Sequence, residues 1–112
     1  MNVALHVLDG TYGRPAAGVR VRLERIENGL WLTEVKAETD HEGRIAEWRA
    51  HRFERGLHRI VFETDPYFVG LGLTAAYPEI SAMFRMHDDA DTYQVRVLLS
   101  PFSYSVYFGS HS

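Results

Sequence analysis

Short runs of alternating apolar and polar side chains follow one another along most of the chain. Val3, Leu5 and Val7 share one face of the first run, and residues 19–24 alternate apolar with charged side chains. Alternation with a period of two predicts strands that have one face on a core. Similar runs predict strands over residues 30–36, 44–48, 57–62, 80–86, 93–99 and 102–108. Seven or eight short strands with closely spaced turns predict an all-β sandwich of two sheets.

Turn signals separate these runs, and one segment has a helical pattern. The pair Asn28-Gly29 predicts a tight hairpin, because both positions of such a turn need a positive φ that these residues tolerate. Asp65 and Pro66 form the pattern of a helix start, with Asp65 as the cap and Pro66 at the first helical position. The predicted helix covers residues 67–71 and is short, because glycines follow within two turns.

Composition narrows the class of protein without naming a function. A chain of 112 residues with 46% hydrophobic and 24% charged residues predicts a single globular domain over residues 1–112. A net charge of −3 without a basic run speaks against a nucleic-acid partner, and no apolar stretch is long enough to span a membrane. The chain has no cysteine and no cationic segment followed by an apolar run after Met1, so the expected location is the cytoplasm.

Three stretches of the chain carry a combination of motifs. The first is His-Val-Leu-Asp at residues 6–9, followed by Gly-Arg-Pro-Ala-Ala-Gly at residues 13–18. The second is Thr-Asp-His-Glu-Gly-Arg at residues 39–44, and the third is Leu-Leu-Ser-Pro-Phe-Ser-Tyr-Ser-Val-Tyr-Phe-Gly-Ser at residues 98–110. In this order and spacing they resemble the transthyretin-related family and its 5-hydroxyisourate hydrolases, and the resemblance covers nearly the whole chain.

The resemblance implies a transthyretin-like sandwich of two four-stranded sheets with one short helix. It also implies a homotetramer, assembled as a dimer of dimers, with two ligand channels through its centre. In transthyretin the channel binds thyroid hormone, whereas the enzymes use it to open a cyclic amide of an oxidised purine. The implied activity is therefore a cyclic-amide hydrolase of urate or purine catabolism, with a small purine-like ring as its partner and no cofactor or metal.

Four residues match the site of the resembling enzymes. His6 matches the histidine of the first strand, and Arg44 matches the arginine after the Asp-Gly turn. Ser110 and Tyr107 match the terminal Tyr-Arg-Gly-Ser motif. The resemblance therefore implies His6, Arg44 and Ser110 as catalytic residues and Tyr107 as a residue that binds substrate.

Four other positions depart from the pattern. Thr92 and Gln94 replace the His-x-His pair, Phe108 replaces the terminal arginine, and Arg96 replaces a proline. Thr92, Gln94 and Phe108 are interpreted as substrate-binding residues. The side chain of Arg96 has the same strand parity as Gln94, and it either supplies a displaced cation or is an exposed arginine at a strand edge.

The replacements change the expected chemistry. Histidine can take a proton from water because its pKa of about 6.5 lies near neutrality, whereas glutamine and threonine only orient a water. Loss of one base costs a factor of about 10²–10⁴, so turnover of ordinary 5-hydroxyisourate is expected to be weak. Added aromatic surface favours a less polar ring, such as an N-methylated 5-hydroxyisourate. The alternative is a binding protein that keeps the channel and has lost the chemistry.

The remaining histidines and acidic residues have simpler interpretations. Without the resemblance, His6 would be read as a hydrogen-bonded core histidine and Arg44 as a solvated one at a strand start. His111 is either a substitute base or part of a frayed terminus. The other histidines, His41, His51, His58 and His87, have no spacing typical of metal ligands. The acidic residues at 88–91 lack the glycine and distal glutamate of a calcium loop.

Overall fold

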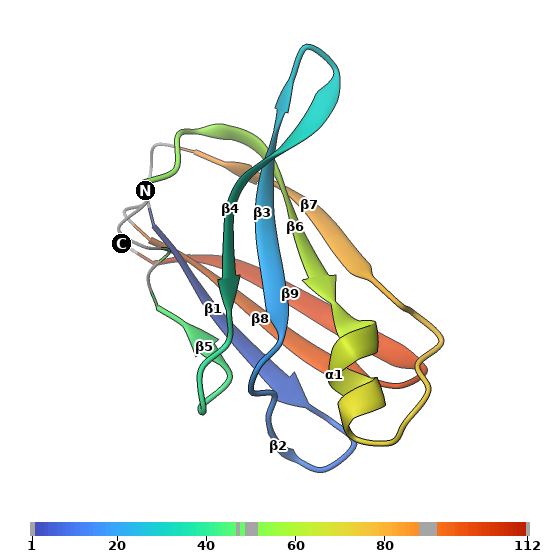
Figure 1. The fold of residues 1–112 in the computed structure, drawn as a ribbon. Helices are drawn as coiled ribbons and strands as arrows, with labels where there is room; N and C mark the ends of the chain where they lie inside the picture. Colours follow the sequence, from blue (N-terminus) through green and yellow to red (C-terminus); the bar gives the residue numbers. More distant parts are fainter. Residues whose placement is uncertain (1, 47, 49–51, 88–91, 112) are drawn as a thin grey trace.

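A computed structural model describes residues 2–46, 48, 52–87 and 92–111, and it contains two sheets that pack face to face (Figure 1). In spatial order, the first sheet contains β2 (Arg14–Pro15), β1 (Asn2–Asp9), β8 (Thr92–Ser100) and β9 (Ser103–His111), and β5 (Arg44–Ile45) also pairs with β1. The second sheet contains β4 (Leu30–Glu38), β3 (Arg20–Glu27), β6 (Gly56–Glu63) and β7 (Ile80–Met86). The predicted all-β sandwich is therefore confirmed.

The core lies between the two sheets and is built by the alternation seen in the sequence. Val3, Leu5 and Val7 of β1 are buried, and they meet side chains such as Leu23 and Ile60 of the second sheet. Successive residues of a strand point to opposite faces, so the even-numbered residues of β1 lie on the outer face of the first sheet. This outer face carries the candidate site.

The structure corrects the predicted start of the helix. Helix α1 covers Thr64–Gly70, so Asp65 lies inside its first turn and is not its cap. The helix begins earlier than predicted because the buried hydroxyl of Thr64 donates a hydrogen bond to the carbonyl oxygen of Tyr77, 2.5 Å away. The helix follows β6 at one end of the sandwich (Figure 1).

Two other local predictions have different outcomes. Asn28 and Gly29 have φ values of 52° and 78°, which confirms the predicted hairpin turn. The strand predicted over residues 44–48 pairs with β1 only over Arg44–Ile45. It is shorter because Trp48 inserts into the core, where its indole Nε1–H donates to the carbonyl oxygen of Val3 at 2.7 Å.

Within the described ranges, no helix is long and apolar enough to cross a membrane. Two features noted in the sequence, His51 and the acidic residues at 88–91, lie outside the described residues.

Candidate functional site

The register of the first sheet gathers three polar side chains around one histidine. His6 pairs with Arg96 of the parallel strand β8 and with Arg44 of the antiparallel strand β5. Ala4 pairs with Gln94 in the same parallel ladder. Because paired residues of a sheet share a face, His6, Arg44, Gln94 and Arg96 all lie on the outer face of the first sheet.

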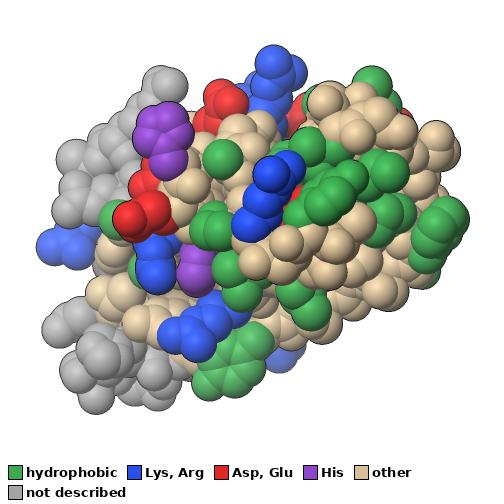
Figure 2. Space-filling view, turned by 90° about the horizontal axis from the view of Figure 1, so that it is seen from below, with side chains coloured by type: hydrophobic (Ala, Val, Ile, Leu, Met, Phe, Trp, Pro, Cys, Tyr) green, Lys and Arg blue, Asp and Glu red, His purple; other side chains and the backbone are tan. Residues whose placement is uncertain are grey.

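These residues line a small hollow of about 70 Å³. The small side chain of Ala4 helps to open it, and His6 and Gln94 are half-buried at its wall. Among the described residues, no aspartate or glutamate lines the hollow. The view from below shows histidine, basic and acidic side chains gathered over one half of the molecule, with hydrophobic side chains dominating the other half (Figure 2).

The turn before β5 holds the imidazole of His6 in place. The ring Nε2–H of His6 donates to the carbonyl oxygen of Glu42 at 3.1 Å. One carboxylate oxygen of Asp40 accepts the backbone N–H groups of Glu42 and Arg44, each at 2.9 Å. These hydrogen bonds hold the pKa of the Asp40 carboxyl below its usual value. The turn therefore places the carbonyl that orients the histidine and, two residues later, the arginine beside it.

Gly43 lets this turn approach the first strand. Its φ is +74°, and a Cβ atom at this position would lie 2.3 Å from the carbonyl oxygen of Val7. The backbone N–H of Val7 donates to the carbonyl of Gly43 at 2.7 Å, so the two backbones are in direct contact. A residue with a side chain would force the turn, and the group that orients His6, away from β1.

The hydrogen bond to Glu42 also decides which ring nitrogen of His6 can take a proton. Nε2 carries the hydrogen that it donates, so Nδ1 keeps the free lone pair in the neutral ring. Burial and the neighbouring Arg44 guanidinium lower the pKa of His6, and Arg96 lowers it further. The Glu42 carbonyl and the Asp40 carboxylate oppose this shift. His6 is therefore a neutral imidazole near pH 7, able to accept a proton from a water.

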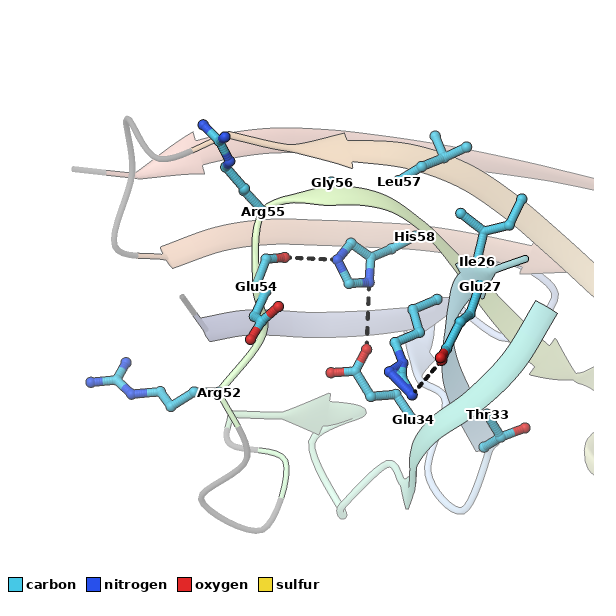
Figure 3. A pocket seen from close by; sticks show the side chains of 11 residues that line it. Ile26, Glu27, Thr33, Glu34, Arg52, Glu54, Arg55, Gly56, Leu57 and His58 are labelled. Carbon is cyan, nitrogen blue, oxygen red and sulfur yellow. Dashed lines mark hydrogen bonds and ion pairs between the residues drawn. The ribbon is translucent and has the colours of Figure 1, made fainter. Parts of the chain in front are cut away.

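A much larger hollow, of about 820 Å³, lies away from these residues (Figure 3). It contains none of the residues predicted to be catalytic or substrate-binding. Its most buried polar group is His58, whose Nε2–H donates to the carbonyl oxygen of Glu54 at 2.8 Å. The other ring nitrogen, Nδ1, lies 3.8 Å from a carboxylate oxygen of Glu34. Size alone therefore does not identify the candidate site, which is chosen on the chemistry of its side chains.

Comparison with known proteins gives the family. The family model described as "HIUase/Transthyretin family" matches residues 3–109. The 5-hydroxyisourate hydrolase of Salmonella dublin is 37% identical over 109 residues, which are 96% of this chain and 80% of that protein. The chain belongs to the HIUase/transthyretin family. The resemblance stated from the sequence motifs is confirmed.

Solved structures of the family have the same fold. Sea bream transthyretin, determined in complex with thyroxine, has a TM-score of 0.89 at 27% identity, covering 100% of this chain and 98% of that one. The 5-hydroxyisourate hydrolase of Klebsiella pneumoniae has a TM-score of 0.82 at 28% identity, covering 98% and 100% of the two chains. The transthyretin-like form of the predicted sandwich is thereby confirmed.

This member of the family places its predicted site residues unequally around the hollow. Arg44 and Gln94 lie beside His6, as described above. Tyr107 pairs with Arg96 and is largely exposed, so it extends the same outer face onto β9. Thr92 pairs with Asn2 at the beginning of the parallel ladder and does not line the hollow.

Phe108 lies on the other face of β9. It pairs with the buried Val95, and its ring stacks on Tyr93 with centroids 5.0 Å apart. The Phe84 ring of the second sheet lies 4.7 Å from it. Phe108 therefore packs in the core between the sheets and does not contact the hollow. The alternation of β9 already implies this result, because Tyr107 and its neighbour must point to opposite faces.

The predicted residues at the end of the chain have a position in the sheet but no described side chain. Ser110 pairs with Tyr93, and His111 pairs with Thr92. The orientation of the Ser110 hydroxyl and of the His111 ring lies outside the described part of the structure. No group of three or more potential metal ligands occurs among the residues that are described.

Proposed function

We propose that this chain is a hydrolase of cyclic amide C–N bonds, of the 5-hydroxyisourate hydrolase type, in the breakdown of oxidised purines. The observation that carries the proposal is the placement of His6, which the Glu42 carbonyl orients and Arg44 flanks in a hollow on the outer face. The names of the relatives support the same chemistry. The reaction needs a proton acceptor, a cation for developing negative charge and a place for one edge of a ring, and this hollow offers each of them.

In the proposed mechanism, Nδ1 of His6 takes a proton from a water, and the resulting hydroxide attacks the carbonyl carbon of the cyclic amide. The carbonyl oxygen becomes an oxyanion, which the guanidinium of Arg44 stabilises. The C–N bond then breaks, and the imidazolium of His6 returns its proton to the leaving nitrogen. The product is a single opened-ring molecule with a new carboxylic acid, which then ionises and releases a proton to solvent, so one water is consumed and His6 is regenerated.

Gln94 and Tyr107 have supporting roles in this proposal, and Ser110 is kept as a catalytic group. The amide of Gln94 holds the ring edge or the water through neutral hydrogen bonds, because it faces the hollow but has no basic nitrogen. Tyr107 offers an exposed aromatic surface on the same face. Ser110 is proposed as the third catalytic group, from its match to the terminal motif of the family.

The substrate is proposed to differ from 5-hydroxyisourate itself and to be a related ring, such as an N-methylated form. Its support is the replacement of the family's second histidine by Gln94, which changes the hydrogen bonds available to the ring. The aromatic side chain of Phe108 gives no support to a less polar substrate, because it packs in the core. Thr92 does not line the hollow either, so it gives no support to a changed substrate.

Stopped-flow turnover of freshly generated 5-hydroxyisourate and its N-methylated forms tests both proposals. His6→Ala should lower kcat/KM by a factor of about 10²–10⁴. His87→Ala is the matched control, because His87 is exposed and does not line the hollow, and it should leave turnover unchanged. Equal turnover by His6→Ala and wild type would show that the catalytic assignment is wrong. Faster turnover of the unmethylated ring would contradict the substrate shift, and binding without turnover would favour a binding protein.

We also propose a cytoplasmic homotetramer that buries the outer face of the first sheet. Three apolar side chains of this face are more than one-third exposed in the single chain: Leu8, Leu98 and Tyr107. Exposed apolar side chains of this kind, gathered on a sheet, are typical of an interaction surface. Light scattering coupled to size-exclusion chromatography measures the assembly, and a monomer at micromolar concentration would contradict it.

A further inference from the structure

Two arginines line the hollow beside His6, and no aspartate or glutamate among the described residues lines it with them. Among the described residues, Arg96 has no ion-pair partner. Arg44 has only Glu42, at 3.9 Å, and more than half of each side chain is exposed to solvent. Such an exposed and distant pair is worth little. Two guanidinium groups therefore face the hollow without strong partners.

The second sheet offers a comparison, because arginines on its outer face form ion pairs with a carboxylate. Arg22 and Arg59 lie on its outer face, and both bind the buried carboxylate of Glu24, at 3.1 Å and 2.7 Å. The fold therefore supplies a buried carboxylate where arginines gather on one sheet. Among the described residues, no carboxylate pairs with Arg96, although this arginine lies on the strand next to the half-buried imidazole of His6.

The arrangement has an energetic cost in the absence of a ligand. Burial is the largest cause of the lowered pKa of His6, and Arg44 and Arg96 both add to it, while the Glu42 carbonyl and the Asp40 carboxylate oppose it. An anion bound between the two guanidinium groups would remove the repulsion that they exert on a protonated His6 and accept their hydrogen bonds. Guanidinium groups suit carboxylates and delocalised N–C–O anions, because their planar N–H groups can bind two oxygen or nitrogen acceptors at once.

We propose that Arg96 determines substrate specificity and, with Arg44, makes the hollow a subsite for a negatively charged edge of an oxidised purine ring. The charged edge is either a ring N–H that has lost its proton or a carboxylate substituent. The hollow has room for one edge of a bicyclic ring, and the rest of the ring lies over Gln94 and Tyr107 on the outer face. The inference rests on the proposed function, and it narrows the substrate class: a ring that is alkylated on every nitrogen, and therefore uncharged, is a poor ligand.

Equilibrium binding tests this inference apart from turnover. The probes are urate, which is a monoanion at neutral pH, and tetramethylurate, which is methylated on every ring nitrogen and uncharged. Isothermal titration of the full-length protein should show tighter binding of urate. Arg96→Gln should weaken urate binding roughly 5- to 50-fold, as expected for loss of a charge-assisted hydrogen bond at a partly exposed site, and leave tetramethylurate binding within about twofold.

Arg20→Gln is the matched control. It makes the same chemical change on β3, in the other sheet, at an exposed residue that does not line the hollow. It should leave the affinity for both probes within about twofold, and Arg96→Lys should recover part of the loss in urate affinity, because lysine keeps the charge but not the planar fork.

Several results would overturn the inference. They are no urate binding by wild type at millimolar concentration, unchanged urate affinity in Arg96→Gln, an equal loss for both probes, or an equal loss in Arg20→Gln. The proposed hydrolysis fails separately. If His6→Ala turns over 5-hydroxyisourates as wild type does while urate binding still depends on Arg96, the catalytic proposal falls and the anion subsite stands.

Discussion

Replacing Thr39 by valine should lower the free energy of unfolding by about 2–4 kcal/mol, because the change leaves a buried donor and a buried acceptor without partners. The hydroxyl oxygen of Thr39 accepts the backbone N–H of Val19 at 2.8 Å. The same hydroxyl donates to the carbonyl oxygen of Ala16 at 2.7 Å. Each orphaned backbone group costs about 1–3 kcal/mol, and the additional buried methyl group returns at most about 0.8 kcal/mol.

The perturbation also reaches the candidate site through the backbone. Thr39 comes directly before Asp40, whose carboxylate organises the turn that holds the His6 ring. Loosening the start of this turn should let the Glu42 carbonyl move away from Nε2 of His6. Catalytic efficiency should therefore fall at temperatures where the variant is still folded, without any change to a residue of the hollow.

Urea unfolding at fixed protomer concentration measures the change in stability, because the proposed assembly would make the midpoint depend on concentration. Thr39→Ser is the control: it keeps the hydroxyl, loses one methyl group and should cost only about 1 kcal/mol. If the valine variant is as stable as the serine variant, the two hydrogen bonds do not anchor the turn, and the reasoning that ties the Thr-x-x-x-Gly-Arg motif to the site is refuted.

Three further predictions follow. Gly43→Ala should lower the melting temperature much more than Gly29→Ala does. Both glycines have a positive φ, but only a Cβ atom at Gly43 would meet backbone, at 2.3 Å, so equal losses would contradict this. The lowered pKa of His6 predicts that kcat/KM rises with pH with a midpoint below 6.5, and an acid limb above 6.5 would exclude His6 as the base. The same lowered pKa predicts that the contribution of His6 to the free energy of unfolding declines as the pH falls below 6.5. The separate losses of His58→Phe and Glu34→Leu should sum to more than the loss of the double variant, because each single change already removes the 3.8 Å contact between Nδ1 of His58 and the Glu34 carboxylate. Additive losses in urea unfolding would show that this contact does not contribute to stability.

Local patterns in the sequence predict the strands of this fold well, because the alternation of apolar side chains decides which face is buried. The Asn28-Gly29 turn follows from local chemistry in the same way. The errors occur where a distant contact overrides local preference. The helix begins early because Thr64 binds the carbonyl of Tyr77, and β5 ends early because the indole of Trp48 reaches Val3. Neither contact can be read from neighbouring residues.

Part of the candidate site also follows from the sequence, and part depends on contacts between strands. The motif match predicts that His6 and Arg44 belong together, and the register of β1 with β5 makes them direct neighbours. The motif match predicts Phe108 as a substrate-binding residue, but the parity of its strand directs the side chain into the core. Parity also predicts the face of Arg96. Whether a carboxylate neutralises this arginine depends on side chains from other strands, so it required the structure.

The two sides of His6 are built by different parts of the fold. The turn at residues 39–44 orients the ring through the Glu42 carbonyl, and this segment keeps the family's threonine, glycine and arginine. Strand β8 supplies the opposite wall, and it carries Gln94 and Arg96 at the positions where the motif resemblance implies histidine and proline. Since β8 lines the hollow through its own side chains, replacing them can change the charge of the hollow without moving His6. In the proposed function, replacements on this strand would therefore change what the site recognises, while His6, the proposed proton acceptor, stays in place.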